Sequence, residues 1–552
     1  MLEDLVAAWN EGDYTAMTEH FDADSATEWP PQRLATLFER AHTSGAITGI
    51  TVSLSDTSGS AAGDNPDDAA DDAADEATAY LAEYSIAYRS DAADQEILMS
   101  GRLSATYSEE DERWTIEWSK ELLWPDIPDA HGFDISVTWP RRAPLLDGER
   151  RPIAAGPVAS RRYPFAAVGG TTVGHLEPLK KKDIVAGDFH EPGDIVGGSG
   201  LEAAFERRLA GRPTTKLHVV DRRGTIAETV GHTIGRRADP LRTTLDMDVQ
   251  RAAESAYGST TGGAVVLDPR TGDLLAAVSS SPFDPANYVG IAGIEPFNRA
   301  LSGLYPPGSS LKVMTAAAAL ETGVVKPTTK LTGPAEYKGV RNFESGEFGT
   351  LTFADALTNS VNTAFAQVAE DLGAERLDRF ADAFGFDRAP AMPLGAATSS
   401  FPFPADEGDV MWGSIGQAQV LATPLHMATI AATVANRGRR MEPRITFNQE
   451  KHGTRVVTRQ VARTLTGLME SVVQEGTGVA AQISGVRVAG KTGTAEVDVD
   501  GERKNHAWFI AFAPADDPKV AIAVVSEYGG VGGQVAAPLA RAILTAVLPL
   551  VR

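Results

Sequence analysis

A serine and a lysine three residues apart, Ser309 and Lys312, could together form a nucleophile and its base. Pro306-Pro307-Gly308 disfavours helix and the following alanines favour it, so we expect Ser309 at the N-terminus of a helix. Lys312 then lies one turn further on the same face, within reach of the serine hydroxyl. A lysine can activate a serine if burial and a second cation lower its pKa. Taken alone, the pair would more simply be a helix cap and a surface lysine.

Two further motifs change this interpretation. Ser360-Val361-Asn362 lies in a predicted loop between helical stretches and offers a hydroxyl and a carboxamide. Lys491-Thr492-Gly493-Thr494 continues an alternating run, which predicts a strand in which the glycine lets a ligand approach the backbone. No histidine belongs to a Gly-x-Ser-x-Gly arrangement, so a Ser-His-Asp triad has no support.

The segment from Gly485 to Thr492 also matches the phosphate-loop pattern G-x-x-x-x-G-K-[ST]. Such a loop needs inward-facing backbone amides and a helix that starts at the lysine. Here the four intervening residues alternate as in a strand, and Asp500-Gly501 predicts a hairpin turn shortly afterwards. We therefore do not expect nucleotide binding.

The order Ser-x-x-Lys, Ser-x-Asn, Lys-Thr-Gly resembles the signature of the penicillin-binding protein and serine β-lactamase superfamily. The segment Trp412 to Gln417 is similar to another segment of that superfamily, except that Ala418 stands where a glycine is usual. The resemblance implies a multidomain α+β protein. Its C-terminal transpeptidase/β-lactamase-like domain would have an antiparallel sheet flanked by helices plus an all-α subdomain.

The resemblance also implies roles for the polar residues. Ser309 would attack the carbonyl between the two terminal D-alanines of a peptidoglycan stem peptide, and Lys312 would accept its proton. Ser360 would relay a proton towards the departing amine. Asn362 would hydrogen-bond the substrate amide and orient Lys312.

The Lys-Thr-Gly strand would bind the substrate carboxylate. Lys491 would add positive potential, and Thr492 and Thr494 would bind the carboxylate beside Gly493. The backbone N–H groups of Ser309 and Thr494 would stabilise the oxyanion. The reaction implied is acyl transfer without a metal or cofactor.

Length and composition set the outer limits. A chain of 552 residues predicts three to four domains at about 150 residues each. The net charge of −24 disfavours nucleic acid as a partner, and the absence of cysteine removes disulfides and thiolate chemistry. The sequence contains no apolar stretch of membrane-spanning length and no export signal at its start.

We expect three domains. Residues 1–128 resemble the nuclear-transport-factor-2-like N-terminal domain of methicillin-resistance-type penicillin-binding proteins, and they include an acidic tract from Ser58 to Glu76 that predicts a mobile loop. Residues 129–244 resemble the pedestal, or dimerisation, domain, which carries a similar Gly-x-Ser-Gly-Leu-Glu element. Residues 245–552 would form the penicillin-binding transpeptidase domain.

The resemblance favours a monofunctional class B enzyme, a peptidoglycan D,D-transpeptidase that β-lactams acylate. Its partners would be stem peptides, β-lactam antibiotics and membrane proteins of cell-wall synthesis such as a glycosyltransferase. It would act at the extracytoplasmic face of the cell membrane, with an N-terminal anchor that this chain lacks. A D,D-carboxypeptidase or β-lactamase and a non-catalytic cell-wall scaffold remain the alternatives.

Overall fold

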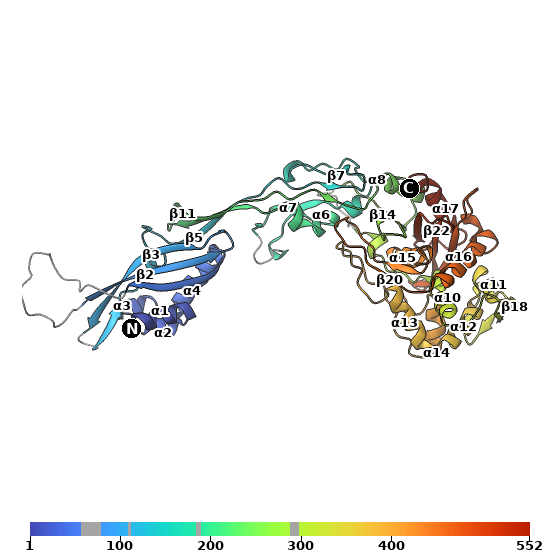
Figure 1. The fold of residues 1–552 in the computed structure, drawn as a ribbon, viewed down its shortest axis with the longest axis horizontal. Coiled ribbons are helices and arrows are strands. Elements are labelled where there is room, and N and C mark those ends of the chain that lie inside the picture. Colours follow the sequence, from blue (N-terminus) through green and yellow to red (C-terminus); the bar gives the residue numbers. More distant parts are fainter. Residues whose placement is uncertain (57–78, 109–111, 184–188, 288–296, 552) are drawn as a thin grey trace, which may run out of the picture. The chain divides into compact units, whose positions relative to one another are not determined.

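The structure is a computed structural model that describes residues 1–56, 79–108, 112–183, 189–287 and 297–551. The chain forms two compact units, which we describe separately (Figure 1). The first unit contains Met1–Arg141, Leu179–Pro192 and Ala210–Ala238. The second contains Arg142–Pro178, Gly193–Leu209 and Asp239–Arg552. No helix in the described ranges combines the length and hydropathy that a membrane span requires.

The first unit begins with helices that lie on one face of an antiparallel sheet (Figure 1). The helices are α1 (Leu2–Glu11), α2 (Tyr14–Thr18), α3 (Ala23–Glu28) and α4 (Pro31–Ser44). The strands, in spatial order, are β1 (Ile47–Asp56), β2 (Ala79–Ser90), β3 (Ile97–Ser108) and β4 (Arg113–Ile116). The predicted acidic loop falls in 57–78 and lies outside the described residues.

Aromatic side chains fill the space between these helices and the sheet. Trp9 and Phe21 both pack on Trp118, with ring centroids 4.8 and 5.1 Å apart. Tyr88 is fully buried, and its hydroxyl donates a hydrogen bond to a backbone carbonyl. The alternating aromatics of the sequence therefore form a core.

A second, three-stranded sheet belongs to the same unit. Leu217 and Val219 from its central strand join the core that contains Tyr88. Its strands, in spatial order, are β11 (Ile226–Thr233), β10 (Thr214–Val220) and β5 (Gly132–Thr138). All three strands come from the segment predicted as a pedestal, so part of that segment belongs to the first compact unit. The predicted domain boundaries at 128 and 244 stay predictions.

The second unit begins with short elements held by buried charges. Glu202 is fully buried and accepts from Arg142 and Arg161, each at 2.8 Å. Burying one carboxylate against two guanidiniums is favourable only with such close geometry. The elements here are β6 (Leu145–Leu146), β7 (Pro152–Ala154), α5 (Gly170–Val173), β8 (Leu176–Pro178), β9 (Ile195–Gly197), α6 (Gly200–Ala204), α7 (Glu206–Ala210) and β12 (Leu241–Arg242).

A five-stranded antiparallel sheet forms the centre of the rest of the second unit, with strands in the spatial order β14-β13-β23-β22-β21. Its strands are β13 (Gly262–Leu267), β14 (Leu274–Ser279), β21 (Ala489–Val499), β22 (Glu502–Ala513) and β23 (Val520–Ser526). Helices α8 (Met247–Tyr257) and α17 (Ala536–Val547) cover one face and share its apolar core. Helices α15 (Pro424–Ala435) and α16 (Arg459–Gln474) pack on the other side (Figure 1). The predicted helix-flanked antiparallel sheet is confirmed.

A helical subdomain contains α10 (Lys312–Glu321), α11 (Phe353–Thr358), α12 (Asn362–Leu372), α13 (Ala374–Phe384) and α14 (Glu407–Ser414). It also carries two short two-stranded sheets, which the prediction of an all-α subdomain did not include. These pair β15 (Lys330–Gly333) with β18 (Gly349–Thr352), and β16 (Glu336–Tyr337) with β17 (Val340–Arg341).

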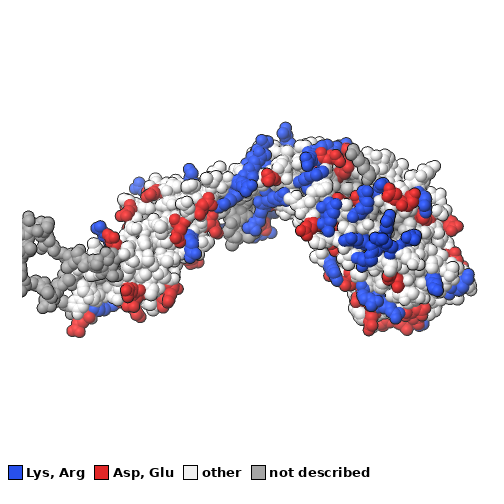
Figure 2. Space-filling model, viewed as in Figure 1, with Lys and Arg blue, Asp and Glu red and all other residues white. Residues whose placement is uncertain are grey.

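The net charge of −24 does not describe every part of the surface. On the face of the second unit shown in Figure 2, Lys and Arg side chains gather near the centre, and most Asp and Glu side chains lie towards the edge. The sign of the local potential therefore has to be judged site by site.

Replacing Ala418 by glycine should stabilise the protein. Ala418 has a φ of 58°, in the left-handed region that costs an alanine free energy and a glycine almost none. We expect Ala418→Gly to raise the free energy of unfolding by about 0.5–1 kcal/mol, measured by urea denaturation. Gly416→Ala, also at positive φ (76°), should have the opposite effect, and equal stabilities for Ala418→Gly and the wild type would contradict the prediction.

Candidate active site

The nucleophile candidate lies where a tight turn runs into a helix. Ser309 is half-buried in the short 3-10 helix η4 (Gly308–Leu311), and α10 begins at Lys312 directly afterwards. A hydrogen bond fixes the turn before it: the buried Trp508 indole donates to the Pro306 carbonyl at 2.9 Å. The sequence predicted this helix tip for Ser309.

Glycines permit close backbone contacts around this turn. Gly308 has a φ of 53°, and its N–H donates to the Gly416 carbonyl at 2.8 Å. A Cβ on Gly493 would lie 2.7 Å from the Pro307 carbonyl oxygen and 3.0 Å from the Ser310 nitrogen. Strand β21 can therefore approach the nucleophile turn only because residue 493 has no side chain.

The three motifs meet in one place. Lys312 Nζ donates to the Ser360 carbonyl at 2.7 Å and to Asn362 Oδ1 at 2.5 Å. Ser309 Oγ lies 3.5 Å from the same Asn362 Oδ1. Lys491 Nζ donates to Ser360 Oγ at 2.8 Å. The structure therefore brings together Ser309, Lys312, Ser360, Asn362 and Lys491, which come from η4, α10, the α11–α12 turn, α12 and β21.

Burial sets the protonation of both lysines. Burial, and then the nearby charge of Lys491, hold the pKa of Lys312 well below its usual value. Burial also lowers the pKa of Lys491 to about 7. Neither side chain is exposed to solvent. Burial therefore favours the neutral amine form of Lys312, and Lys491 titrates near neutral pH.

A neutral Lys312 has a free lone pair and can therefore act as a base. A primary amine carries two N–H donors and one lone pair, and the Ser360 carbonyl and Asn362 Oδ1 take the two donors. The lone pair is then free to accept a proton, and the Ser309 hydroxyl shares the Asn362 Oδ1 acceptor with Lys312. This arrangement can activate a serine for attack on a carbonyl.

The remaining predicted residues lie on β21, the edge strand of the sheet. Thr492 Oγ1 is 2.7 Å from Thr477 Oγ1, and Thr494 Oγ1 accepts from the Gly532 backbone N–H at 3.1 Å. Lys491 pairs with Ile510 of β22 and is not followed by a helix, which agrees with rejecting the phosphate loop.

Sequence reasoning missed three supporting side chains. The Phe365 ring lies 5.2 Å from Lys312 Nζ, and its spacing of three residues from Asn362 on one helix was a usable signal. Thr477, which contacts Thr492, lies in a polar turn without any such signal. Trp508 was assigned to a strand, but its support of Pro306 depends on tertiary packing.

The fold and this site together define a transpeptidase/β-lactamase-like protein. Residues 262–545 match the family model of the penicillin binding protein transpeptidase domain, and residues 148–243 match that of the penicillin-binding protein dimerisation domain. The chain belongs to the penicillin-binding protein transpeptidase family.

Named relatives agree with this assignment. The chain is 38% identical over 363 residues to "Peptidoglycan D,D-transpeptidase PbpA" of Mycolicibacterium smegmatis, covering 56% of this chain and 73% of that protein. It is 29% identical over 443 residues to "Peptidoglycan D,D-transpeptidase MrdA" of Acinetobacter baumannii. That match covers 70% of this chain and 65% of that protein.

Solved structures show the same likeness. The crystal structure of PBPA from Mycobacterium tuberculosis superimposes with a TM-score of 0.61 at 33% identity, covering 74% of this chain and 98% of that one. The penicillin G acyl-enzyme complex of that protein gives a TM-score of 0.60 at 32% identity. The match covers 74% of this chain and 99% of that one.

Acylation should become slower as the pH rises through about 7, the pKa of Lys491. In the role that the sequence predicts for it, Lys491 offers a positive charge to the antibiotic's carboxylate, and loss of its proton removes that charge. We expect the second-order rate constant for acylation by penicillin G to fall above a pH of about 7. In Lys491→Arg the side chain stays protonated, so this fall should be absent.

The methyl ester of penicillin G provides the matched control. It has no carboxylate, so its alkaline fall should be absent even with the wild-type protein. An unchanged alkaline fall in Lys491→Arg would contradict the assignment to Lys491.

Gly493→Ala should disable the site while leaving the protein folded. The new Cβ would meet backbone atoms of Pro307 and Ser310, which cannot move aside without shifting the nucleophile turn. We expect stopped-flow acylation to slow by about 100-fold, since sub-ångström misplacement has effects of this size. The control is Gly467→Ala in α16, where a Cβ meets open space. Equal acylation rates in the two variants would refute the steric argument.

Proposed function

We propose that the protein is a peptidoglycan D,D-transpeptidase that forms its acyl-enzyme on Ser309. The observation that carries the proposal is the convergence of two buried amines, Lys312 and Lys491, on the Ser360 and Asn362 side chains beside Ser309. The named relatives are D,D-transpeptidases, and a similar structure is a penicillin G acyl-enzyme, which supports this chemistry.

In the first half-reaction, Ser309 Oγ attacks the carbonyl between the two terminal D-alanines while Lys312 Nζ takes its proton. The tetrahedral oxyanion accepts from the backbone N–H groups of Ser309 and Thr494, each worth about 2.7–4 kcal/mol in such sites. Ser360 passes a proton to the departing D-alanine amine as the peptide bond breaks.

In the second half-reaction, the amine of another stem peptide attacks the Ser309 ester. Lys312, which has passed the Ser309 proton on to Ser360, takes the proton of the attacking amine and delivers it to Ser309 Oγ as the ester bond breaks and the cross-link forms. In the first half-reaction, Lys491, with Thr492 and Thr494, holds the terminal carboxylate of the donor peptide, which departs with the released D-alanine. We propose no metal or cofactor for either step.

The proposal extends to the rest of the chain. We infer a monofunctional class B enzyme at the extracytoplasmic face of the membrane, working with membrane proteins of cell-wall synthesis. We propose 1–128 as a nuclear-transport-factor-2-like domain, because helices α1–α4 lie against a sheet there. We propose 129–244 as the pedestal, which overlaps the dimerisation match at 148–243, and 245–552 as the transpeptidase domain.

Incubation with a fluorescent penicillin should give one covalent adduct by intact-mass spectrometry, located on Ser309 by peptide mapping. Ser309→Ala removes the attacking oxygen and should abolish it, and Lys312→Met should slow its formation by about 1000-fold or more, as expected for the loss of a general base and its hydrogen bonds. Ser255→Ala, at an exposed serine of α8, is the matched control. A Ser309→Ala protein that still forms the adduct would refute the nucleophile.

The same experiment separates the alternatives. A stable adduct, together with cross-linking of a synthetic stem peptide to an amine acceptor, supports a transpeptidase. Rapid loss of the adduct with release of hydrolysed antibiotic supports a β-lactamase, and stem-peptide hydrolysis without cross-linking supports a carboxypeptidase. No adduct at all supports a scaffold.

A further inference from the structure

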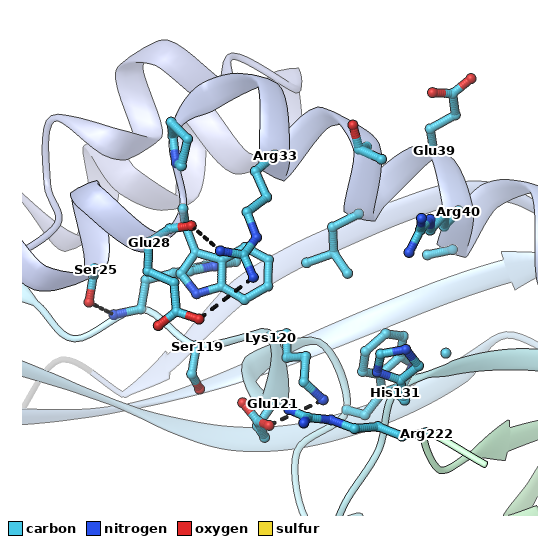
Figure 3. A pocket seen from close by; sticks show the side chains of 18 of the residues that line it. Ser25, Glu28, Arg33, Glu39, Arg40, Ser119, Lys120, Glu121, His131 and Arg222 are labelled. Carbon is cyan, nitrogen blue, oxygen red and sulfur yellow. Dashed lines mark hydrogen bonds and ion pairs between the residues drawn. The ribbon is translucent and has the colours of Figure 1, made fainter. Parts of the chain in front are cut away.

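A cavity of about 1780 Å³ lies in the first unit, and none of its lining residues belongs to the proposed catalytic machinery (Figure 3). Its wall comes from α3 and α4, from the short 3-10 helix η1 (Lys120–Leu123), and from the start of β5. A cavity of this size can hold a drug-sized ligand. Nothing in the proposed acyl transfer uses it.

Aromatic side chains make one wall of this cavity. Trp29, Trp118, Trp124 and Phe133 all line it, and each is less than one-tenth exposed. Trp124 and Phe133 pack edge to face with ring centroids 5.6 Å apart, which fixes their orientation. The wall is therefore rigid and apolar, although only a small part of each ring faces the cavity.

Cationic side chains gather at one end of the cavity. Figure 3 shows Lys120, His131 and Arg222 close together, with Arg40 of α4 on the opposite side. Burial, and then the charges of Lys120, Arg222 and Arg40, lower the pKa of His131. Arg40 and Arg222 form no ion pair within the described part of the chain.

Lys120 is the buried member of this group. It is 9% exposed, and its Nζ donates to the Ala130 carbonyl at 2.6 Å. Its one carboxylate neighbour, Glu121 at 3.3 Å, is 53% exposed. An ammonium carries three N–H donors, so Lys120 has capacity for a further acceptor that enters from the cavity.

The acidic residues nearer the aromatic wall have local partners. Glu28 lies 3.7 Å from the Arg33 guanidinium, which also stacks over Trp29 at 4.3 Å. Asp22 accepts from the Ser25 backbone and so caps α3. Asp24, Glu39 and Glu117 also line the cavity, so positive charge is in excess only beside His131, where the charges of Lys120, Arg222 and Arg40 outweigh that of Asp221.

We propose that this cavity binds a small organic anion whose planar apolar body packs on the tryptophan wall and whose single acidic group is held by Lys120 and Arg222. Charge-assisted hydrogen bonds from a buried ammonium and a guanidinium are the strongest polar contacts available for a sulfonate, carboxylate or phosphate. The aromatic wall contributes the apolar area that such a ligand needs for affinity.

A matched pair of fluorescent probes tests the proposal on the full-length protein. 8-Anilinonaphthalene-1-sulfonate carries the planar body and one sulfonate, and N-phenyl-1-naphthylamine carries the same body without the charge. We expect the sulfonate probe to bind at least about tenfold more tightly than the neutral probe, as one charge-assisted hydrogen bond allows. Equal affinities of the two probes would overturn the proposal.

Variants then locate the bound sulfonate. Lys120→Met should weaken its binding by about tenfold or more and Arg222→Gln by about threefold, with the neutral probe unchanged in both. Arg222 is exposed, so its variant should fold even if Lys120→Met does not. Arg89→Gln, an exposed arginine of β2 outside the cavity, is the matched control. Sulfonate binding that Arg222→Gln leaves unchanged would refute the site.

A second readout keeps this test separate from the catalytic proposal. Melting temperature and acylation by the fluorescent penicillin should be the same in Arg222→Gln and the wild type. If the protein forms no acyl-enzyme but the sulfonate probe still responds to Arg222→Gln, the cavity proposal holds and the transpeptidase proposal fails. If the protein forms the acyl-enzyme but sulfonate binding does not respond to Arg222→Gln, the transpeptidase proposal holds and the cavity proposal fails.

Discussion

Two amines that share one hydroxyl, Ser360 Oγ, are the constraint on which the rest of the catalytic unit depends. Lys491 donates to this oxygen at 2.8 Å, and Lys312 lies 3.4 Å from it. Both lysines are fully buried, and two buried ammonium groups at this distance would repel each other strongly. At least one of them therefore gives up its proton, and it does so beside the half-buried Ser309 hydroxyl.

The elements around the site hold these amines in place. Ser360 has a φ of 59°, a left-handed conformation that turns its carbonyl and its hydroxyl towards different lysines. Asn362 is held in turn, because its Nδ2 donates to the Arg341 carbonyl at 2.8 Å and leaves Oδ1 for Lys312. A strained turn and a tethered amide thus hold Lys312 in position, as an aspartate holds the histidine in other serine enzymes.

The sequence carries strong signals for the residues of the candidate site and weak signals for the packing between segments, for one physical reason. Ser309 and Lys491 lie in segments with strong local signals, namely a proline-rich helix start and an alternating strand. The grouping of β5, β10 and β11 with the first unit depends on Leu217 and Val219 entering a core formed by residues more than a hundred positions away. The contact of Gly416 with Gly308 depends on the tertiary fold in the same way.

Direct backbone contact around the nucleophile has an evolutionary consequence. Gly308 meets Gly416, Gly493 meets Pro307, and a Cβ on Gly532 would fall 2.1 Å from the Gly493 carbonyl oxygen. Because backbone contacts backbone here, neighbouring residues can be substituted without displacing the serine. A side chain added at any of these glycines would instead meet backbone that adjoins the serine, so we expect sequence change to be tolerated beside these positions and not at them.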